Sequence, residues 1–161
     1  MAHKIRLRDD GFAFVDIEIK PMNTQTMARL RYKIDTGANC TTISCTELEN
    51  LGYDKNWIKT GKLLVNDERP IAATGLPVDD CYIITIPQIQ IGEWVGYNWP
   101  FMTSLSVPFK CLLGTDSMKF FNWNFDYARN ICTFRLIPGK RKLLFNQTEQ
   151  SIHSLDEINV E

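Results

Sequence analysis

The residues best suited to chemistry in this sequence are Asp35, Thr36 and Gly37, which follow one another at the end of a predicted strand. A carboxylate can take or give a proton, and a threonine hydroxyl can both donate and accept a hydrogen bond. Glycine adopts backbone angles that other residues avoid and lets another backbone approach closely. Such a turn would hold Asp35 rigidly while its oxygens stay open. The other interpretation is an ordinary turn in which Asp35 bonds to its own backbone.

Alternating strands are expected to position this turn. Residues 28–34 alternate apolar and charged side chains and run directly into Asp35, and residues 15–19 show the same alternation. Further short strands are expected at 41–43, 63–65, 70–73, 81–86, 89–91, 97–102, 125–127 and 131–136. Helical turns are expected at 46–51 and 115–121, and residues 54–61 indicate a loop. The sum is a mostly β fold, a small closed β-barrel with one or two short helices.

A second segment, Cys111-Leu112-Leu113-Gly114-Thr115-Asp116-Ser117-Met118, has two apolar residues and a glycine that lead into a helix. With Tyr32-Lys33-Ile34-Asp35-Thr36-Gly37-Ala38, it resembles the paired motifs of the retropepsin-like (retroviral-type) aspartic proteases. The pattern is especially similar to the protease-like domain of the DNA-damage-inducible shuttle proteins and their bacterial relatives. The resemblance covers roughly residues 12–136. Between the motifs it is one of pattern only.

The resemblance implies a closed barrel of the acid-protease type, a mobile flap over a cleft and a two-fold dimer. Under this resemblance, Asp35 would be the catalytic residue. Thr36 would form a hydrogen bond across the dimer axis to the partner chain, and Gly37 would help to fix the carboxylate and the bound substrate. Asp116 matches no catalytic role. We expect it to cap the helix, as Thr115 also could, or to bond within the core.

The chemistry of two carboxylates requires two chains here. Amide hydrolysis needs one group to take a proton from water and another to polarise the carbonyl. Two carboxylates held close share one proton, because like charges repel. The 161 residues contain a single Asp-Thr-Gly. A protease of this kind must therefore be a homodimer that cleaves a polypeptide, and it requires no metal and no organic cofactor.

The flap candidate is the segment Ala73-Thr74-Gly75, in which Gly75 supplies flexibility. An ordinary loop glycine is an equally good interpretation of Gly75. Three large apolar side chains are favoured as core over substrate pockets, because aromatic residues in small β folds mostly pack: Ile84, Trp99 and Phe101.

Composition excludes several other classes of function. A hydrophobic content of 44% suits one compact domain, and a net charge of -1 with scattered basic residues gives no reason to expect nucleic acid as a partner. No segment approaches the ~18 apolar residues of a membrane span, and the N-terminus has no signal-like apolar core. The five cysteines show no metal-site spacing. We expect reduced thiols and a cytoplasmic location.

The predicted organisation is an N-terminal arm over 1–11, a protease-like domain over 12–137 and a C-terminal extension over 138–161. The extension is expected to be partly disordered, weakest from 147 on, or to contribute to the dimer. An active endopeptidase is the first hypothesis. One alternative is a catalytically silent dimer that binds peptides or acts as a scaffold, and another is a β-barrel whose Asp35 is only a turn residue. The intact Asp-Thr-Gly favours the first, because a binding module does not need the acid.

Overall fold

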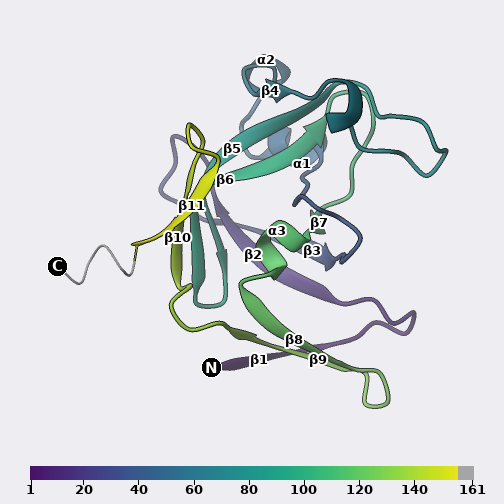
Figure 1. Cartoon of the computed structure of the whole chain (residues 1–161), viewed down its shortest axis with the longest axis vertical. Helices are drawn as coiled ribbons and strands as arrows, with labels where there is room; N and C mark the ends of the chain where they lie inside the picture. Colours follow the sequence, from purple (N-terminus) through teal and green to yellow (C-terminus); the bar gives the residue numbers. More distant parts are fainter. Residues whose placement is uncertain (156–161) are drawn as a thin grey trace.

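The computed structural model describes residues 1–155, and most of its strands form one large curled sheet (Figure 1). The strands of that sheet follow one another in the order β11 (Ser151–Ser154), β10 (Lys142–Asn146), β6 (Trp94–Ser104), β5 (Cys81–Ile91), β2 (Phe14–Lys20), β3 (Ala28–Ile34) and β7 (Leu112–Leu113). A short strand, β4 (Lys62–Leu63), pairs with β5 outside this path.

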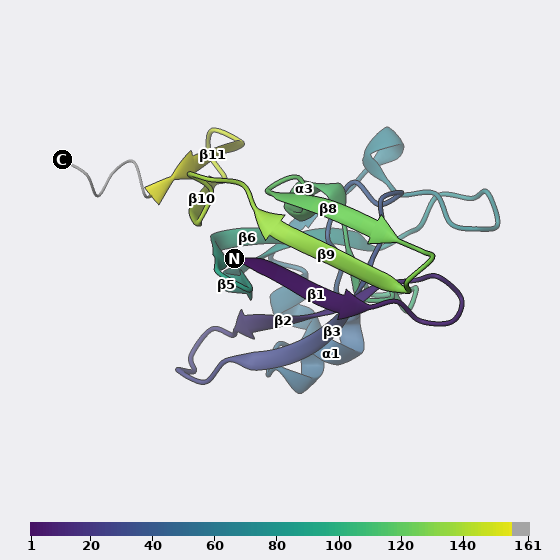
Figure 2. The ribbon, with the colours of Figure 1, turned by 90° about the horizontal axis from the view of Figure 1, so that it is seen from below.

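A smaller antiparallel sheet lies below the first in Figure 1 and in front of it in Figure 2. Its strands are, in order, β1 (Ala2–Arg6), β9 (Ile131–Leu136) and β8 (Phe121–Asp126). The predicted N-terminal arm therefore supplies a strand that pairs with most of β9, from Ala2 opposite Arg135 to Arg6 opposite Ile131. The short strands expected at 125–127 and 131–136 correspond to the end of β8 and to β9, which pair as an antiparallel hairpin.

The helical segments are short: α1 (Cys45–Asn50), α2 (Lys55–Ile58), α3 (Thr115–Met118) and a 3₁₀ turn, η1 (Asn66–Glu68). The expectation of one or two helices was wrong, because α2 is an additional helix in a segment where a loop was expected. The Asp54 carboxylate accepts a hydrogen bond from the Trp57 amide at 2.8 Å and so caps this turn. Trp57 also stacks on Tyr53, with ring centroids 4.0 Å apart. An N-cap and one aromatic contact thus stabilise a helix too short to show periodicity.

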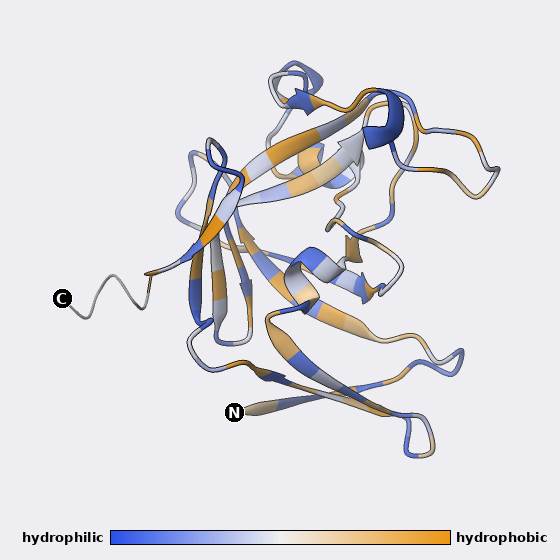
Figure 3. Cartoon of the chain, in the orientation of Figure 1, coloured by the Kyte–Doolittle hydropathy of each residue, from blue (hydrophilic) through white to orange (hydrophobic). Residues whose placement is uncertain are grey.

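The core confirms the alternation of the early strands. Val15, Ile17 and Ile19 of β2 are all at most 5% exposed, while the intervening charged side chains face outward. Figure 3 shows hydrophobic and hydrophilic residues alternating along several strands. The three side chains favoured as core are buried: Ile84, Trp99 and Phe101.

The larger sheet curls into a half-barrel, and a mostly β architecture is as predicted (Figure 1). Its pairing path starts at β11 and ends at β7, and within residues 1–155 these two strands do not pair with each other. A closed barrel therefore stays a prediction. Within the same residues, no helix is both long enough and apolar enough to cross a membrane.

Two irregular regions differ from the sequence expectations. The strand pieces expected at 81–86 and 89–91 are one strand, β5, that continues through Pro87. The region from 147 on, expected to be the weakest part of the extension, forms β11, which pairs with β10 from Leu143 opposite Ser154 to Asn146 opposite Ser151. Residues 156–161, the rest of that region, lie outside the described residues.

Replacing Ile17 with Ala tests which face of β2 is buried. Ile17 is 0% exposed, so Ile17→Ala should lower the free energy of unfolding by about 2–5 kcal/mol through lost burial and a residual cavity. Glu18→Ala, one residue along on the outer face, removes only an exposed pair with Arg29 and should cost at most about 1 kcal/mol. Urea unfolding of both variants measures the difference, and equal losses would contradict the strand assignment.

Candidate functional site

Two segments far apart in the sequence meet at the Asp35 turn. The end of β3 pairs in parallel with β7, so that Lys33 lies opposite Leu112 and Ile34 opposite Leu113. The Asp35 amide donates to the Leu113 carbonyl at 3.0 Å. The hydrogen-bond pattern between β3 and β7 therefore continues to the first residue of the turn. The structure therefore brings together the two motifs that the sequence analysis singled out.

Gly114 permits this meeting, because there is no room for a side chain. A Cβ at Gly114 would lie 2.7 Å from both the carbonyl carbon and the oxygen of Cys40, and 2.9 Å from the Ala38 oxygen. These atoms belong to the backbone and cannot move aside cheaply. On the far side, the Thr115 amide donates to the Ala38 carbonyl at 2.8 Å. The turn after Asp35 is thus held against the start of α3.

A buried polar cluster fixes the chain after the turn. The Thr41 hydroxyl donates to Asp116 Oδ1 at 2.7 Å, and the Thr41 amide donates to Asp116 Oδ2 at 3.1 Å. The Gly114 amide donates to the same hydroxyl at 3.2 Å. Asp116 therefore bonds within the core, one of its two predicted roles. The capping role is wrong for both candidates, Asp116 and Thr115, because Gly114 is the N-cap and makes no side-chain bond.

Within the turn, the Asp35 carboxylate is half-buried and Oδ1 accepts a hydrogen bond from the Gly37 amide at 2.9 Å. The Ala38 amide donates to the Asp35 carbonyl at 3.2 Å and closes the turn. Thr36 and Gly37 are exposed. The geometry is therefore that of a carboxylate oriented by a backbone amide and open to the surroundings.

A cavity of about 920 Å³ lies beside this turn, and we call it the cleft. Asp35 and Gly37 line the cleft, whereas Thr36 lies outside its lining. Most of the other lining is apolar and includes Leu64, Val78, Ile83, Met102 and Phe109. The apolar run Val107-Pro108-Phe109 also lines it. Only Lys110 separates that run from the second motif, and this position is the signal by which the sequence analysis could have found it.

The flap candidate is the tip of a loop over residues 70–78 that projects from the sheet (Figure 1). The Val78 amide donates to the Pro70 carbonyl at 2.9 Å and closes the base of this loop. Ala73 lines the cleft, whereas Thr74 and Gly75 lie outside its lining. Gly75 has φ +84° and occupies open space, so it makes the turn at the tip of the loop. Its immediate neighbour, Leu76, is 67% exposed.

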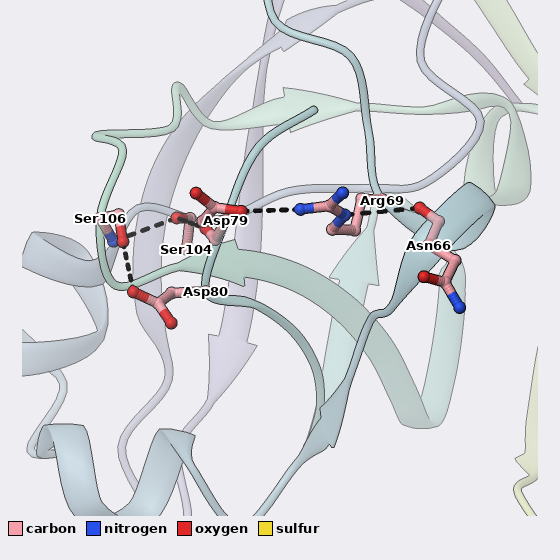
Figure 4. A network of polar contacts seen from close by, with 6 residues as sticks. All are labelled: Asn66, Arg69, Asp79, Asp80, Ser104 and Ser106. Atoms are coloured by element: carbon pink, nitrogen blue, oxygen red, sulfur yellow. Dashed lines mark hydrogen bonds and ion pairs between the residues drawn. The ribbon is translucent and has the colours of Figure 1, made fainter. Parts of the chain in front are cut away.

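An ion pair between Arg69 and Asp79 connects the two ends of the 70–78 loop (Figure 4). Arg69 Nη1 donates to Asp79 Oδ1 at 2.7 Å, across the two ends of the 70–78 loop. The Asp79 carbonyl in turn accepts from the Ser104 hydroxyl of β6 at 3.0 Å. The base of the loop is therefore fixed to the sheet through Asp79. Sequence reasoning missed this pair, because it depends on the path of the loop.

Cys40 lies next to the turn and lines the cleft. Burial, and secondarily the Asp116 carboxylate, raises the pKa of the Cys40 thiol to about 12. The thiol therefore stays protonated near neutral pH and is not a competing nucleophile.

Replacing Asp116 with Asn should make stability less dependent on pH. Burial raises the pKa of Asp116, against the opposing effect of the Thr41 hydrogen bonds. From the ordinary carboxyl pKa of 3.8 up to the raised value, the unfolded carboxyl is ionised while the folded one keeps its proton. Its contribution to stability is therefore complete below this window and falls as pH rises through it. Asn cannot titrate, and it should also cost about 1 kcal/mol because its NH₂ group, unlike the carboxylate oxygen that it replaces, cannot accept a hydrogen bond from Thr41.

Denaturant unfolding across the acidic pH range measures this slope for the wild type and for Asp116→Asn. Asp9→Asn, which removes an exposed carboxylate between β1 and β2, is the control and should keep the wild-type slope. A slope in Asp116→Asn equal to that of the wild type would contradict the assignment.

Comparison with solved structures supports the fold. The chain matches the crystal structure of a retropepsin-like aspartic protease from Rickettsia conorii with a TM-score of 0.62, over 83% of this chain and 89% of that one, at 18% sequence identity. No family model matches the chain, and no curated protein sequence matches it. At this identity the likeness concerns the fold, which is retropepsin-like.

Proposed function

We propose that this chain is a homodimeric aspartic endopeptidase that hydrolyses peptide bonds between two Asp35 carboxylates, one from each chain. The observation that carries the proposal is the Asp35 carboxylate itself. It lines a cleft of about 920 Å³, at the end of a strand paired with β7. Gly37 orients one of its oxygens, and Oδ2 accepts no hydrogen bond from residues 1–155.

The mechanism divides the work between the two carboxylates. Held close together, they share one proton. The ionised member takes a proton from water, whose oxygen attacks the carbonyl carbon of the substrate, and the protonated member donates to the carbonyl oxygen. Collapse of this tetrahedral intermediate breaks the C–N bond, the proton taken from water passes to the leaving amine, and the proton on the former carbonyl oxygen returns to the carboxylate pair. No metal or organic cofactor enters any of these steps.

The dimer follows from the same chemistry, because each chain supplies one Asp-Thr-Gly. In a two-fold arrangement the exposed Thr36 would bond across the axis to its counterpart. The loop over residues 70–78 would be the flap, with Ala73 facing the substrate and the exposed Ile71 and Leu76 free to close over it. Thr74 and Gly75 would then form the turn at the flap tip.

The substrate class proposed is an extended polypeptide. Main-chain hydrogen bonds hold such peptides, and apolar lining residues such as Leu64 and Met102 suit their side chains. The competing proposal is a catalytically silent dimer that binds peptides. The open and oriented Asp35 favours the enzyme, since binding alone gives no reason for an unpaired acid oxygen in the cleft. The five unpaired thiols suit a reducing compartment such as the cytoplasm.

Asp35→Asn tests the proposal. The variant keeps the shape of the side chain but cannot act as a base, so cleavage of a peptide found in a library screen should fall about a thousandfold or more. Mass spectrometry of the products measures cleavage, and circular dichroism and sedimentation verify that fold and dimer are kept. Asp9→Asn is the control and should cleave normally.

Retained cleavage in Asp35→Asn would overturn the assignment. Peptide binding by both proteins without cleavage by either would instead establish the silent module.

A further inference from the structure

We propose that the cleft continues into a second groove that binds the main chain of a long peptide away from the bond that is cut. This inference rests on the proposed function, because it names a part of the substrate that the same site would bind. The groove is a cavity of about 1030 Å³ between the β10–β11 hairpin, the β5–β6 pair and α2. Figure 1 shows the hairpin beside β6, with which β10 pairs in parallel.

The groove and the cleft are neighbours. Asn39, Cys40 and Ile83 line both of them. Asn39 and Cys40 come only a few residues after Asp35 in the chain. A peptide that lies in the cleft and extends past Ala38 would therefore enter the groove without leaving the protein surface.

Carboxamide side chains distinguish the groove from the mainly apolar cleft. Five of them line it: Asn39, Asn98, Asn146, Gln147 and Gln150. A carboxamide has both donors and an acceptor, and although Asn146, Gln147 and Gln150 each use one of them within the chain, each keeps further capacity for a ligand. The main chain of a peptide likewise presents an N–H and a C=O at almost every residue. The groove therefore matches an extended main chain of almost any sequence.

The charges of the groove favour the same ligand. Lys62 is paired with Glu68 at 2.9 Å. The Asp116 carboxylate accepts two hydrogen bonds from Thr41. The charged residues among the lining are thus already satisfied, so the groove suits an uncharged main chain better than a phosphate or another strongly charged group. Trp57 and Phe145 add apolar surface for side chains.

Backbone geometry turns Asn98 toward the groove. The β5–β6 ladder pairs Ile86 with Trp99 and Gln88 with Tyr97, which leaves Asn98 opposite Pro87. Proline has no amide hydrogen to donate, and Asn98 has φ +50°, so the ladder is interrupted there. Asn98 is exposed as a result.

The hairpin that walls the groove is fixed to the sheet. The Gln147 side chain donates to the Thr85 hydroxyl of β5, and the Gln150 side chain donates to the Gln147 carbonyl at 2.7 Å. By two-fold symmetry, a dimer would carry one such groove at each end of the shared cleft. A long peptide would then gain contacts at both of its ends.

Peptide length is the variable that tests this inference. A peptide is first selected from a library by its binding to Asp35→Asn, so that the choice does not depend on cleavage. A short form of about six residues spans about 20 Å, and a long form adds about four uncharged residues at each end. Fluorescence anisotropy measures the affinity of Asp35→Asn for each form, and cleavage by the wild type is measured separately. The long form should bind about tenfold more tightly, a gain typical of one or two net hydrogen bonds.

Removing a carboxamide should abolish most of this gain. The first variant, in β6, is Asn98→Gly, which is preferred to Asn98→Ala because glycine adopts φ +50° without strain. The second variant, in the β10–β11 hairpin, is Gln150→Gly, at a residue with φ +52°. Each is made in the Asp35→Asn chain and verified by circular dichroism. Gln25→Ala, an exposed carboxamide outside both cavities, is the control and should keep the full preference for the long form.

The outcomes separate the two proposals. If the wild type cleaves both forms and Asp35→Asn binds them with equal affinity, the protease proposal is retained and the groove is overturned. A long-form preference without cleavage would support the groove and count against the enzyme. A preference that survives in both Asn98→Gly and Gln150→Gly would overturn the groove, as would a failure of every library peptide to bind.

Discussion

The parallel pairing of β3 with β7 is the contact on which the candidate site depends. It joins Ile34 to Leu113 and passes directly into the Asp35 turn. The contact requires glycine at 114, because the backbone of Cys40 occupies the space that a Cβ would need. Asp116 and Thr41 then bind the next turn of chain to α3. Asp35 is therefore positioned by backbone contacts, which change little when neighbouring side chains fluctuate.

Much of this arrangement could be predicted from local pattern. The alternation in β2 and β3 identified both strands and their buried faces, because a period of two is visible within a single strand. The sequence also left Asp116 with two roles, and the structure selects the core hydrogen bonds to Thr41. The β10–β11 hairpin and the Arg69–Asp79 pair could not be predicted, because both depend on how distant segments are brought together. Helix α2 was missed because a single turn carries no periodicity.

The long β5–β6 pair links the two cavities of the molecule. Ile83 of β5 and Met102 of β6 line the cleft, while Asn98 and the hairpin added beyond β6 line the groove. Under the proposed function, the β10–β11 hairpin would enlarge the surface available to a substrate without altering the Asp35 turn. What one chain cannot supply is the second carboxylate. The proposed chemistry, unlike the fold, is a property of two chains.

Mixing active and inactive chains tests that claim most directly. Wild-type and Asp35→Asn chains are combined at constant total concentration, allowed to exchange, and assayed for peptide cleavage. If catalysis needs an Asp35 from each chain, only wild-type homodimers are active, and activity falls as the square of the wild-type fraction. An equal mixture should then retain about one quarter of the full activity. A linear fall, to about one half, would show that each chain carries a complete site and would contradict the account.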